Sequence, residues 1–132
     1  MRATATQLAR YCGVGASGYG VNLAVSAFGL TVLGLPVAAA ATLAFCVAAT
    51  GNFLLNRRWT FASRDRRLAR QGGRFLVASL ATLGCGLALL GLLVSAGLPE
   101  LTAQAASVAA ATPVGFALNR RWTFAPREAL AR

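Results

Sequence analysis

The sequence has no lysine, no histidine and almost no acidic residues. Only three Asp and Glu residues occur among 132, and they lie outside the long apolar runs, at Asp65, Glu100 and Glu128. Proton-coupled membrane pumps commonly use an intramembrane carboxylate, and general acid–base catalysis uses a positioned His or a pair of carboxylates. We therefore expect neither a proton-driven exporter nor an enzyme.

Cysteine is scarce, and its spacing forms no recognisable pattern. Cys12, Cys46 and Cys85 stand alone inside apolar runs, with no CxxC pair. Structural zinc sites need clustered Cys and His, and a disulfide framework needs an even number of cysteines. We expect no metal and no cofactor, and we interpret the thiols as small packing residues in helices.

Apolar residues dominate what remains. They make up 57% of the chain and charged residues 12%, with a mean hydropathy of +0.62, whereas soluble domains carry about 25% charged residues. Four apolar segments are each long enough to cross a hydrocarbon core of about 30 Å at about 1.5 Å per residue. They are Tyr11–Leu30, Pro36–Asn56, Phe75–Ala96 and Leu101–Asn119. The first could be a signal peptide, but it lacks a convincing cleavage site, so we favour an uncleaved span.

The arginines predict the topology. They account for the net charge of +10 and lie at the ends of the apolar segments, in Arg2–Arg10, Arg57–Arg74, Arg120–Arg121 and Arg127–Arg132. This layout is typical of the positive-inside rule and not of a nucleic-acid groove. We expect both termini and the middle linker to face the cytoplasm. The lack of Lys and the abundance of Ala, Gly and Arg indicate a GC-rich bacterial genome, so we expect the chain in a bacterial inner membrane. The turns Thr31–Leu35 and Gly97–Glu100, which carry no basic residue, would face the other side.

A sequence repeat organises the chain. LNRRWTF occurs at Leu55–Phe61 and again 63 positions later at Leu118–Phe124. Pro36 matches Pro99 at the same offset, and Arg10 matches Arg74 at an offset of 64. Because each half contains two spans, both halves point the same way across the membrane. The prediction is an all-α membrane protein of four transmembrane helices, built as two parallel two-helix repeats in a single domain, 1–132. Repeat 1 covers about 8–63, a basic cytoplasmic linker about 62–73, and repeat 2 about 72–126.

The repeated motif has two interpretations. Its arginines and aromatics are typical of membrane-interface anchors at helix C-termini. They also suit a phosphate-headed lipid, because arginine presents a planar fork of donors and Asn can hold a hydroxyl. The candidate lipid-phosphate ligands are Arg57, Arg58, Arg120, Arg121, Arg10 and Arg74. The candidate polar groove consists of Asn22, Asn52, Asn56 and Asn119, and the interface aromatics are Trp59, Phe61, Trp122 and Phe124. Helix–helix hydrogen bonding is the alternative role for Asn22, and Gly115 replaces Asn52 in the second half.

The motif resembles the GtrA-like family of small four-span membrane proteins. The likeness covers about residues 8–126 and includes Arg10 with Gly13 and Gly15, Asn22, the segment Asn52–Phe61, and, in the second half, Arg74–Val77 with Leu118–Phe124. The resemblance implies that the protein flips a polyprenyl-phosphate-linked monosaccharide across the cytoplasmic membrane for cell-surface polysaccharide synthesis. It also implies a polyprenyl-phosphate glycosyltransferase as partner.

Other functions stay open on the sequence. The chain could be a non-transporting partner that anchors such a glycosyltransferase through its basic linker. A small multidrug-type exporter is disfavoured because no acidic residue lies inside a span. If the chain is a flippase, four short helices enclose little volume, and a homodimer could complete the path.

Overall fold

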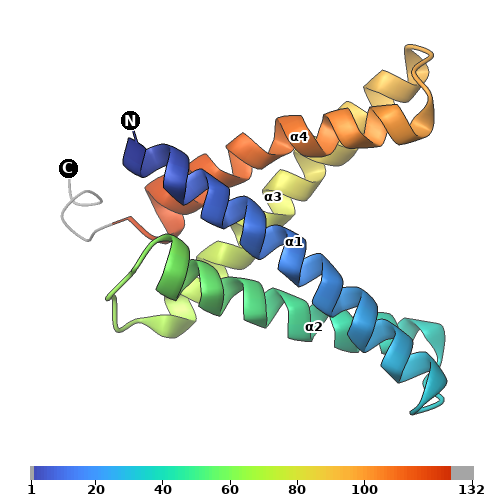
Figure 1. The fold of residues 1–132 in the computed structure, drawn as a ribbon, viewed down its shortest axis with the longest axis horizontal. Helices are drawn as coiled ribbons and strands as arrows, with labels where there is room; N and C mark the ends of the chain where they lie inside the picture. The colour runs from blue at the N-terminus through green and yellow to red at the C-terminus, as the bar shows by residue number, and fades with distance from the viewer. Residues whose placement is uncertain (1, 126–132) are drawn as a thin grey trace. The chain divides into compact units, whose positions relative to one another are not determined.

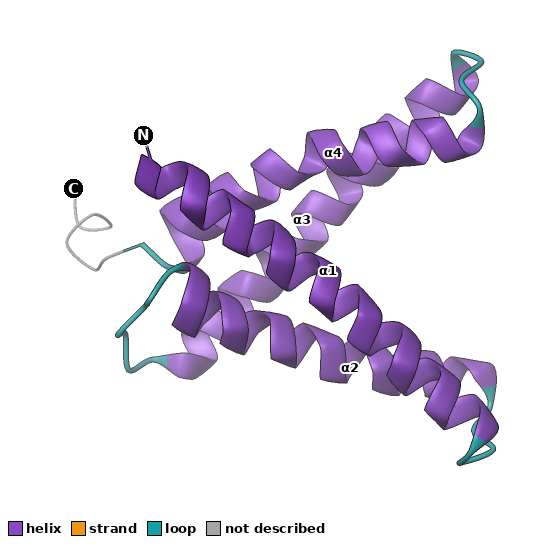
Figure 2. Cartoon of the chain, in the orientation of Figure 1, coloured by secondary structure: helices purple, strands orange, loops and turns teal. Residues whose placement is uncertain are grey.

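The computed structural model describes residues 2–125, so the C-terminal arginine group Arg127–Arg132 lies outside the described residues. Within the described part of the chain there are helices and loops and no strand (Figure 2), which confirms the all-α prediction. The chain divides after Ala62 into two compact units. Each unit holds one pair of helices joined by a short turn (Figure 1).

Unit 1 is a hairpin of α1 (Arg2–Thr31) and α2 (Val37–Leu55), and α2 continues into a π-helix at Asn56–Thr60. Gly34, at φ +62°, allows the sharp turn after α1, since only glycine enters the left-handed region without steric cost. Pro36 follows as the N-cap of α2. The predicted turn with its Leu-Pro pair is thus confirmed.

Unit 2 repeats this arrangement with α3 (Leu68–Ser95) and α4 (Glu100–Leu118), followed by a second π-helix at Asn119–Thr123. Gly97, at φ +89°, closes α3. The Leu98 N–H donates to the Leu93 carbonyl at 3.1 Å and the Gly97 N–H to the Val94 carbonyl at 3.0 Å, which is the Schellman pattern of a helix C-terminus. Pro99 then caps α4.

Two helices begin earlier than hydropathy predicts. α1 starts at Arg2 and not at Tyr11, and α3 starts at Leu68 and not at Phe75. The added residues are mostly Ala, Arg, Gln and Leu, which favour helix as strongly as any residue types do. Hydropathy marks where a helix enters lipid, not where its hydrogen bonding begins.

Three of the four helices are long and apolar enough to cross a membrane. They are Val37–Thr60, Leu68–Ser95 and Glu100–Thr123, with mean hydropathies of 1.7, 2.2 and 1.3. α1 is long enough at 30 residues but is not among them, although the sequence analysis predicts a span at Tyr11–Leu30. Its glycines, serines, tyrosines and Asn22 dilute the apolar residues.

Small residues form the contact within each pair. Along α2, Ala40, Ala44 and Ala48 are buried at every fourth position, and along α4 Ala103 and Ser107 are buried in the same way. A row of small side chains lets helix backbones approach closely. At Gly29 on α1, a Cβ atom would lie 3.1 Å from the Ala40 Cβ, so the two helices nearly touch near their turn.

The large apolar side chains point outward instead. Leu83 and Leu87 of α3, for example, are 56% and 58% exposed, as expected for helices whose solvent is lipid. Cys12, Cys46 and Cys85 lie on helices but are also exposed, so the prediction that they pack inside the protein is wrong for the described units. The contact between the helices of each pair is formed instead by small residues spaced four apart.

A hydrogen bond fastens the linker to the start of α3. The Gln71 Nε2 donates to the Ser63 Oγ at 2.7 Å, and Gln71 is 3% exposed. Because residues 68–73 already belong to α3, the predicted basic linker of 62–73 is irregular only up to Arg67. The bond therefore closes a short loop that carries Arg64, Arg66 and Arg67.

Gln71→Leu should open this loop. Losing one hydrogen bond while leaving the Ser63 hydroxyl unsatisfied costs about 1 kcal/mol, or about a fivefold change in local opening. Tryptic cleavage after Arg64, Arg66 and Arg67 in reconstituted protein should accelerate by that factor. Ser63→Ala should have the same effect, and the double variant should cleave no faster than either single variant. Additive rates would show that the two side chains do not act together.

Candidate functional site

Both copies of LNRRWTF end in the same π-turn. The Phe61 N–H donates to the Asn56 carbonyl at 2.8 Å, and the Phe124 N–H donates to the Asn119 carbonyl at 2.8 Å. These bonds span five residues, one more than in an α-helix, and such turns are frequent at functional sites. A π-turn widens the helix and changes the directions of Arg57 and Arg58 relative to the preceding α-helical residues.

An arginine from the neighbouring helix clamps each π-turn. The Arg10 Nη1 donates to the Trp59 carbonyl at 3.2 Å, and its guanidinium lies 5.5 Å from the centroid of the Trp59 ring. In unit 2 the Arg74 Nη1 donates to the Trp122 carbonyl at 3.1 Å, again 5.5 Å from the ring centroid. Carbonyls at a helix C-terminus have no partner within the helix. A cation there also interacts favourably with the partial negative charge of the helix dipole.

An aromatic pair lies beside each clamp. The rings of Tyr11 and Phe61 are 6.3 Å apart in an edge-to-face arrangement, and those of Phe75 and Phe124 are 6.3 Å apart and tilted by 55°. The aromatic residue that follows the clamping arginine thus meets the last residue of the motif in both units. Phe61 and Phe124 therefore act inside their own units and are not simply a membrane-interface belt, although Trp59 remains 51% exposed.

The arginine pairs of the motif lie in the last turn of each π-helix. Arg58, Arg120 and Arg121 are exposed and Arg57 is half-buried. Two guanidinium groups at a helix C-terminus next to lipid are placed to meet anionic headgroups, at about 1 kcal/mol of attraction per arginine. The six candidate arginines thus fall into two groups: Arg10 and Arg74 bind the backbone, while the four motif arginines lie on the turns themselves.

A row of polar side chains runs along α2 towards the arginine pair. Asn52, Asn56 and Thr60 are spaced by four residues, so they lie one above another on one helix face. Asn56 and Thr60 are only 3% and 2% exposed. The Oδ1 atoms of Asn52 and Asn56 and the Oγ1 of Thr60 are buried and make no hydrogen bond. This row continues the buried alanines at positions 40, 44 and 48.

Unpartnered buried oxygens are costly. A polar atom taken out of water without a hydrogen bond destabilises a protein by about 1–3 kcal/mol, and nearly all such atoms in native proteins have a partner. Three in successive turns of one helix indicate a site built for something that supplies hydrogen-bond donors, either water or a ligand.

Unit 2 has a shorter version of the row. Asn119 is fully buried, and its Nδ2 donates to the Gly115 carbonyl at 2.9 Å. Thr123 is 2% exposed, and its Oγ1 makes no hydrogen bond. Gly115 replaces the amide that Asn52 supplies in unit 1. The predicted groove residues are therefore brought into line only in part: Asn52 with Asn56 on α2, Asn119 on the π-turn of unit 2, and Asn22 half-buried on α1.

A model of the GtrA/DPMS transmembrane domain family matches residues 10–124. The chain belongs to this family. The matched range starts at Arg10 and ends at Phe124, so it contains both clamps, both π-turns and both polar rows. A search of curated proteins found no match. Membership of the GtrA/DPMS family identifies a multi-pass membrane protein of a polysaccharide or glycosylation pathway.

Sequence reasoning missed Thr60 and Thr123 as site residues, and it missed the π-turns. The threonines stand inside the repeated motif, and their spacing of four from Asn56 and Asn119 was the available signal. The π-turns had no such signal in the local pattern, and the arginines that contact them, Arg10 and Arg74, lie 49 and 48 residues away along the chain.

Proposed function

We propose that the protein translocates a polyprenyl-phosphate-linked monosaccharide across the cytoplasmic membrane of a bacterium. The Arg57–Arg58 and Arg120–Arg121 pairs bind the phosphate, and the second guanidinium nitrogens of Arg10 and Arg74 assist. The polar row guides the sugar while the prenyl tail stays in lipid. The proposal includes four spans in two parallel repeats, with the termini and the linker on the cytoplasmic side.

The observation that carries the proposal is the row of Asn52, Asn56 and Thr60. Its oxygens are buried and make no hydrogen bond, and the row ends beside the arginine pair of the same turn. A sugar offers several hydroxyl donors in succession, and its phosphate matches the planar guanidinium. A lipid that carries both groups therefore suits both halves of the site.

The chemistry needed for this function is modest. No bond is made or broken, so no catalytic group is required, and we propose that the protein is not an enzyme. Net flow follows if the sugar is consumed on the outer side. A glycosyltransferase that makes the lipid on the cytoplasmic side is the natural partner, and a second copy of the chain would complete an enclosed path.

A liposome assay tests the proposal. A polyprenyl-phosphate hexose is reconstituted in both leaflets, and the fraction of sugar open to a membrane-impermeant oxidant is followed over time. With the wild-type protein nearly all of the sugar should become accessible, and without protein only the outer-leaflet half. Equal time courses with and without protein would rule out translocation.

A variant pair separates function from folding. In Asn56→Leu and Thr60→Val an apolar group replaces a buried polar group that has an unsatisfied oxygen, a change that is nearly neutral or stabilising for folding. We expect thermal stability equal to or above that of the wild type, with translocation at least about tenfold slower, as loss of one or two hydrogen bonds to the moving sugar predicts. Unchanged translocation would show that the sugar does not follow this row.

A further inference from the structure

The two units differ at one depth in the middle of the helix pair. With the repeat offsets of 64 for the first helix and 63 for the second, Gly18 and Asn52 of unit 1 correspond to Thr82 and Gly115 of unit 2. The small residue and the polar residue have exchanged helices. Asn22 likewise corresponds to Gly86, where a Cβ atom would lie 3.6 Å from the Ala111 Cβ. Amides at this depth therefore occur in unit 1 and not at the matching positions of unit 2.

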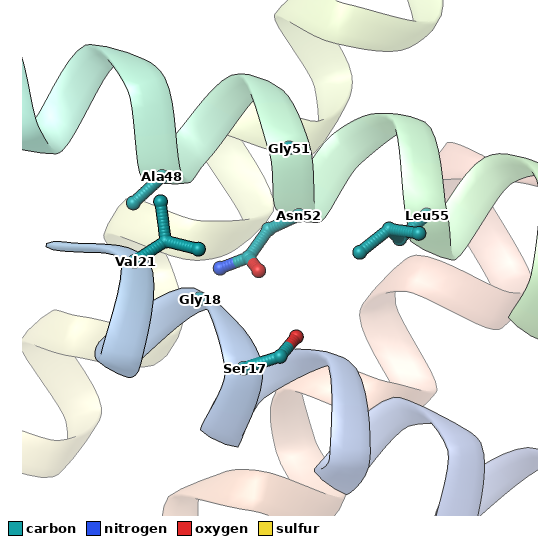
Figure 3. Close-up of a pocket in the computed structure, with 7 residues that line it drawn as sticks. All are labelled: Ser17, Gly18, Val21, Ala48, Gly51, Asn52 and Leu55. Atoms are coloured by element: carbon teal, nitrogen blue, oxygen red, sulfur yellow. The ribbon is translucent and has the colours of Figure 1, made fainter. Parts of the chain in front are cut away.

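In unit 1 the exchange creates a pocket between α1 and α2. Seven residues line it, and Figure 3 shows the Asn52 amide pointing from α2 across to α1 at Gly18. A Cβ atom at Gly18 would overlap the Asn52 amide, so the amide reaches this place only because residue 18 is glycine. The Asn52 Oδ1 is buried there and makes no hydrogen bond.

The other polar group in the pocket is already used. The Ser17 Oγ donates to the Val14 carbonyl at 2.9 Å, within its own helix. At the unit 2 counterpart of Gly18, the Thr82 Oγ1 is likewise bonded to its own helix, donating to the Ala78 carbonyl at 2.8 Å. Asn52 is thus the group in this pocket that has an oxygen still to satisfy.

The size and polarity of the pocket limit what it can take. Its volume is about 30 Å³, against the ~10–15 Å³ that a single water needs. None of the seven lining residues carries a charge. A carboxylate would meet the amide oxygen without a proton to donate, and an ammonium group would have no counter-ion. A neutral hydroxyl fits, because it can donate to the amide oxygen and accept from the amide nitrogen.

We propose that this pocket reads one neutral hydroxyl group of the lipid-linked sugar, with Asn52 as the residue that determines specificity. The inference rests on the proposed function and adds the class of sugar to it, which is a neutral sugar with a hydroxyl at the position that enters the pocket. Asn52 lies one turn, or about 6 Å, along the helix from Asn56. A sugar whose phosphate is held at the arginine pair therefore lies within reach.

Competition binding in nanodiscs tests the inference with defined probes. They are polyprenyl phosphate without sugar, polyprenyl-phosphate glucose, its mono-deoxy analogues and polyprenyl-phosphate glucuronate. We expect the wild type to bind the glucose lipid about five- to tenfold more tightly than at least one deoxy analogue, as loss of a single hydrogen bond predicts. In Asn52→Leu the glucose lipid and that analogue should bind equally.

Matched variants define the controls. Gly18→Ala places a methyl group on the Asn52 amide and should reproduce the loss of selectivity. Thr82→Ala, at the corresponding position of unit 2, should keep wild-type selectivity. Affinity for bare polyprenyl phosphate should be the same in all of these proteins, which also shows that each variant is folded.

The outcomes separate the two proposals. If the wild type binds every deoxy analogue and the glucuronate as tightly as the glucose lipid, the hydroxyl pocket is wrong, while phosphate binding still stands. If selectivity survives in Asn52→Leu, another residue reads the hydroxyl and the assignment to Asn52 is wrong. If bare polyprenyl phosphate does not bind the wild type, the proposed function fails, and the pocket inference fails with it.

Discussion

Replacing Arg57 and Arg58 by glutamine should lower the affinity for polyprenyl phosphate by about a hundredfold. Each charge-assisted hydrogen bond to a phosphate contributes about 1.5–3 kcal/mol, so two of them account for at least about 3 kcal/mol. Glutamine keeps much of the side-chain length and some donors but removes the charge and the planar fork. The effect is measured by titrating the lipid into protein in nanodiscs, and Arg120→Gln/Arg121→Gln should behave similarly.

The control for this prediction lies in the linker. Arg64→Gln/Arg66→Gln also removes two positive charges, but from exposed positions of the loop before α3. General attraction between a basic surface and an anionic lipid would weaken equally in both double variants. A specific site at the motif predicts little change for the loop variant, within about twofold for exposed charges. An equal loss would favour the motif as a topology anchor and the linker as a docking segment for a partner.

Replacing Arg10 by leucine should release the π-turn of unit 1. The guanidinium loses one charge-assisted hydrogen bond to the Trp59 carbonyl and one contact over the Trp59 ring, together about 2–4 kcal/mol. In a Trp122→Phe background Trp59 is the single tryptophan, and because its side chain is already 51% exposed, its quenching by a water-soluble quencher should increase by up to about twofold. The midpoint of denaturation should fall at the same time.

Two further variants test whether the clamp depends on geometry and not only on charge. Arg10→Lys keeps the charge but offers a point donor that cannot lie flat on the indole and also reach the carbonyl, so it should restore less than half of the lost stability. Arg74→Leu in a Trp59→Phe background should give the same response in unit 2, where the distances are nearly identical. Quenching that stays at the wild-type level in Arg10→Leu would show that the π-turn holds itself.

The two clamps change how the motif is understood. The sequence offered two interpretations, a membrane-interface anchor and a phosphate site, and it grouped all six arginines together. In the structure Arg10 and Arg74 are engaged with backbone carbonyls and indole rings. Arg10, Arg74 and the aromatic pairs therefore hold the ends of the helices in place, which is the role that the anchor interpretation gave to the whole motif. The four motif arginines lie on the π-turns themselves, and they are the residues that we propose as ligands of the phosphate.

Much of the fold follows from simple features of the sequence. The long apolar runs and the Gly and Leu-Pro pairs predict two hairpins, and both turns lie where expected, with Gly34 and Gly97 in the left-handed region. The offset of 64 for Arg10 and Arg74, against 63 for the motif, also corresponds to matching contacts in the two units. The apolar runs, the turn residues and the repeat offsets are regular patterns with a physical cause, so the helix pairs and their turns can be predicted from the sequence.

The remaining features depend on tertiary contacts. The bond that defines the π-turn at Asn56–Thr60 is local, from the Phe61 N–H to the Asn56 carbonyl, but the Arg10 side chain that contacts the turn comes from another helix and has no local pattern. The reach of the Asn52 amide depends on the glycine opposite it at position 18. In α1 only part of the low hydropathy has this origin, because Gly18 and Gly29 lie against α2, whereas a Cβ atom at Gly13, Gly15 or Gly20 would meet nothing within 4 Å.

Native mass spectrometry of the protein, gently extracted from its own membrane, tests the central claim most directly. It should be run beside an Arg57→Ala/Arg120→Ala variant prepared in the same way. We predict that the wild type retains a polyprenyl-phosphate-sugar mass, that the variant loses it, and that the bound mass corresponds to a neutral sugar. Bulk phospholipid alone, bound equally by both proteins, would contradict the assignment of the repeated motif as a lipid-phosphate site.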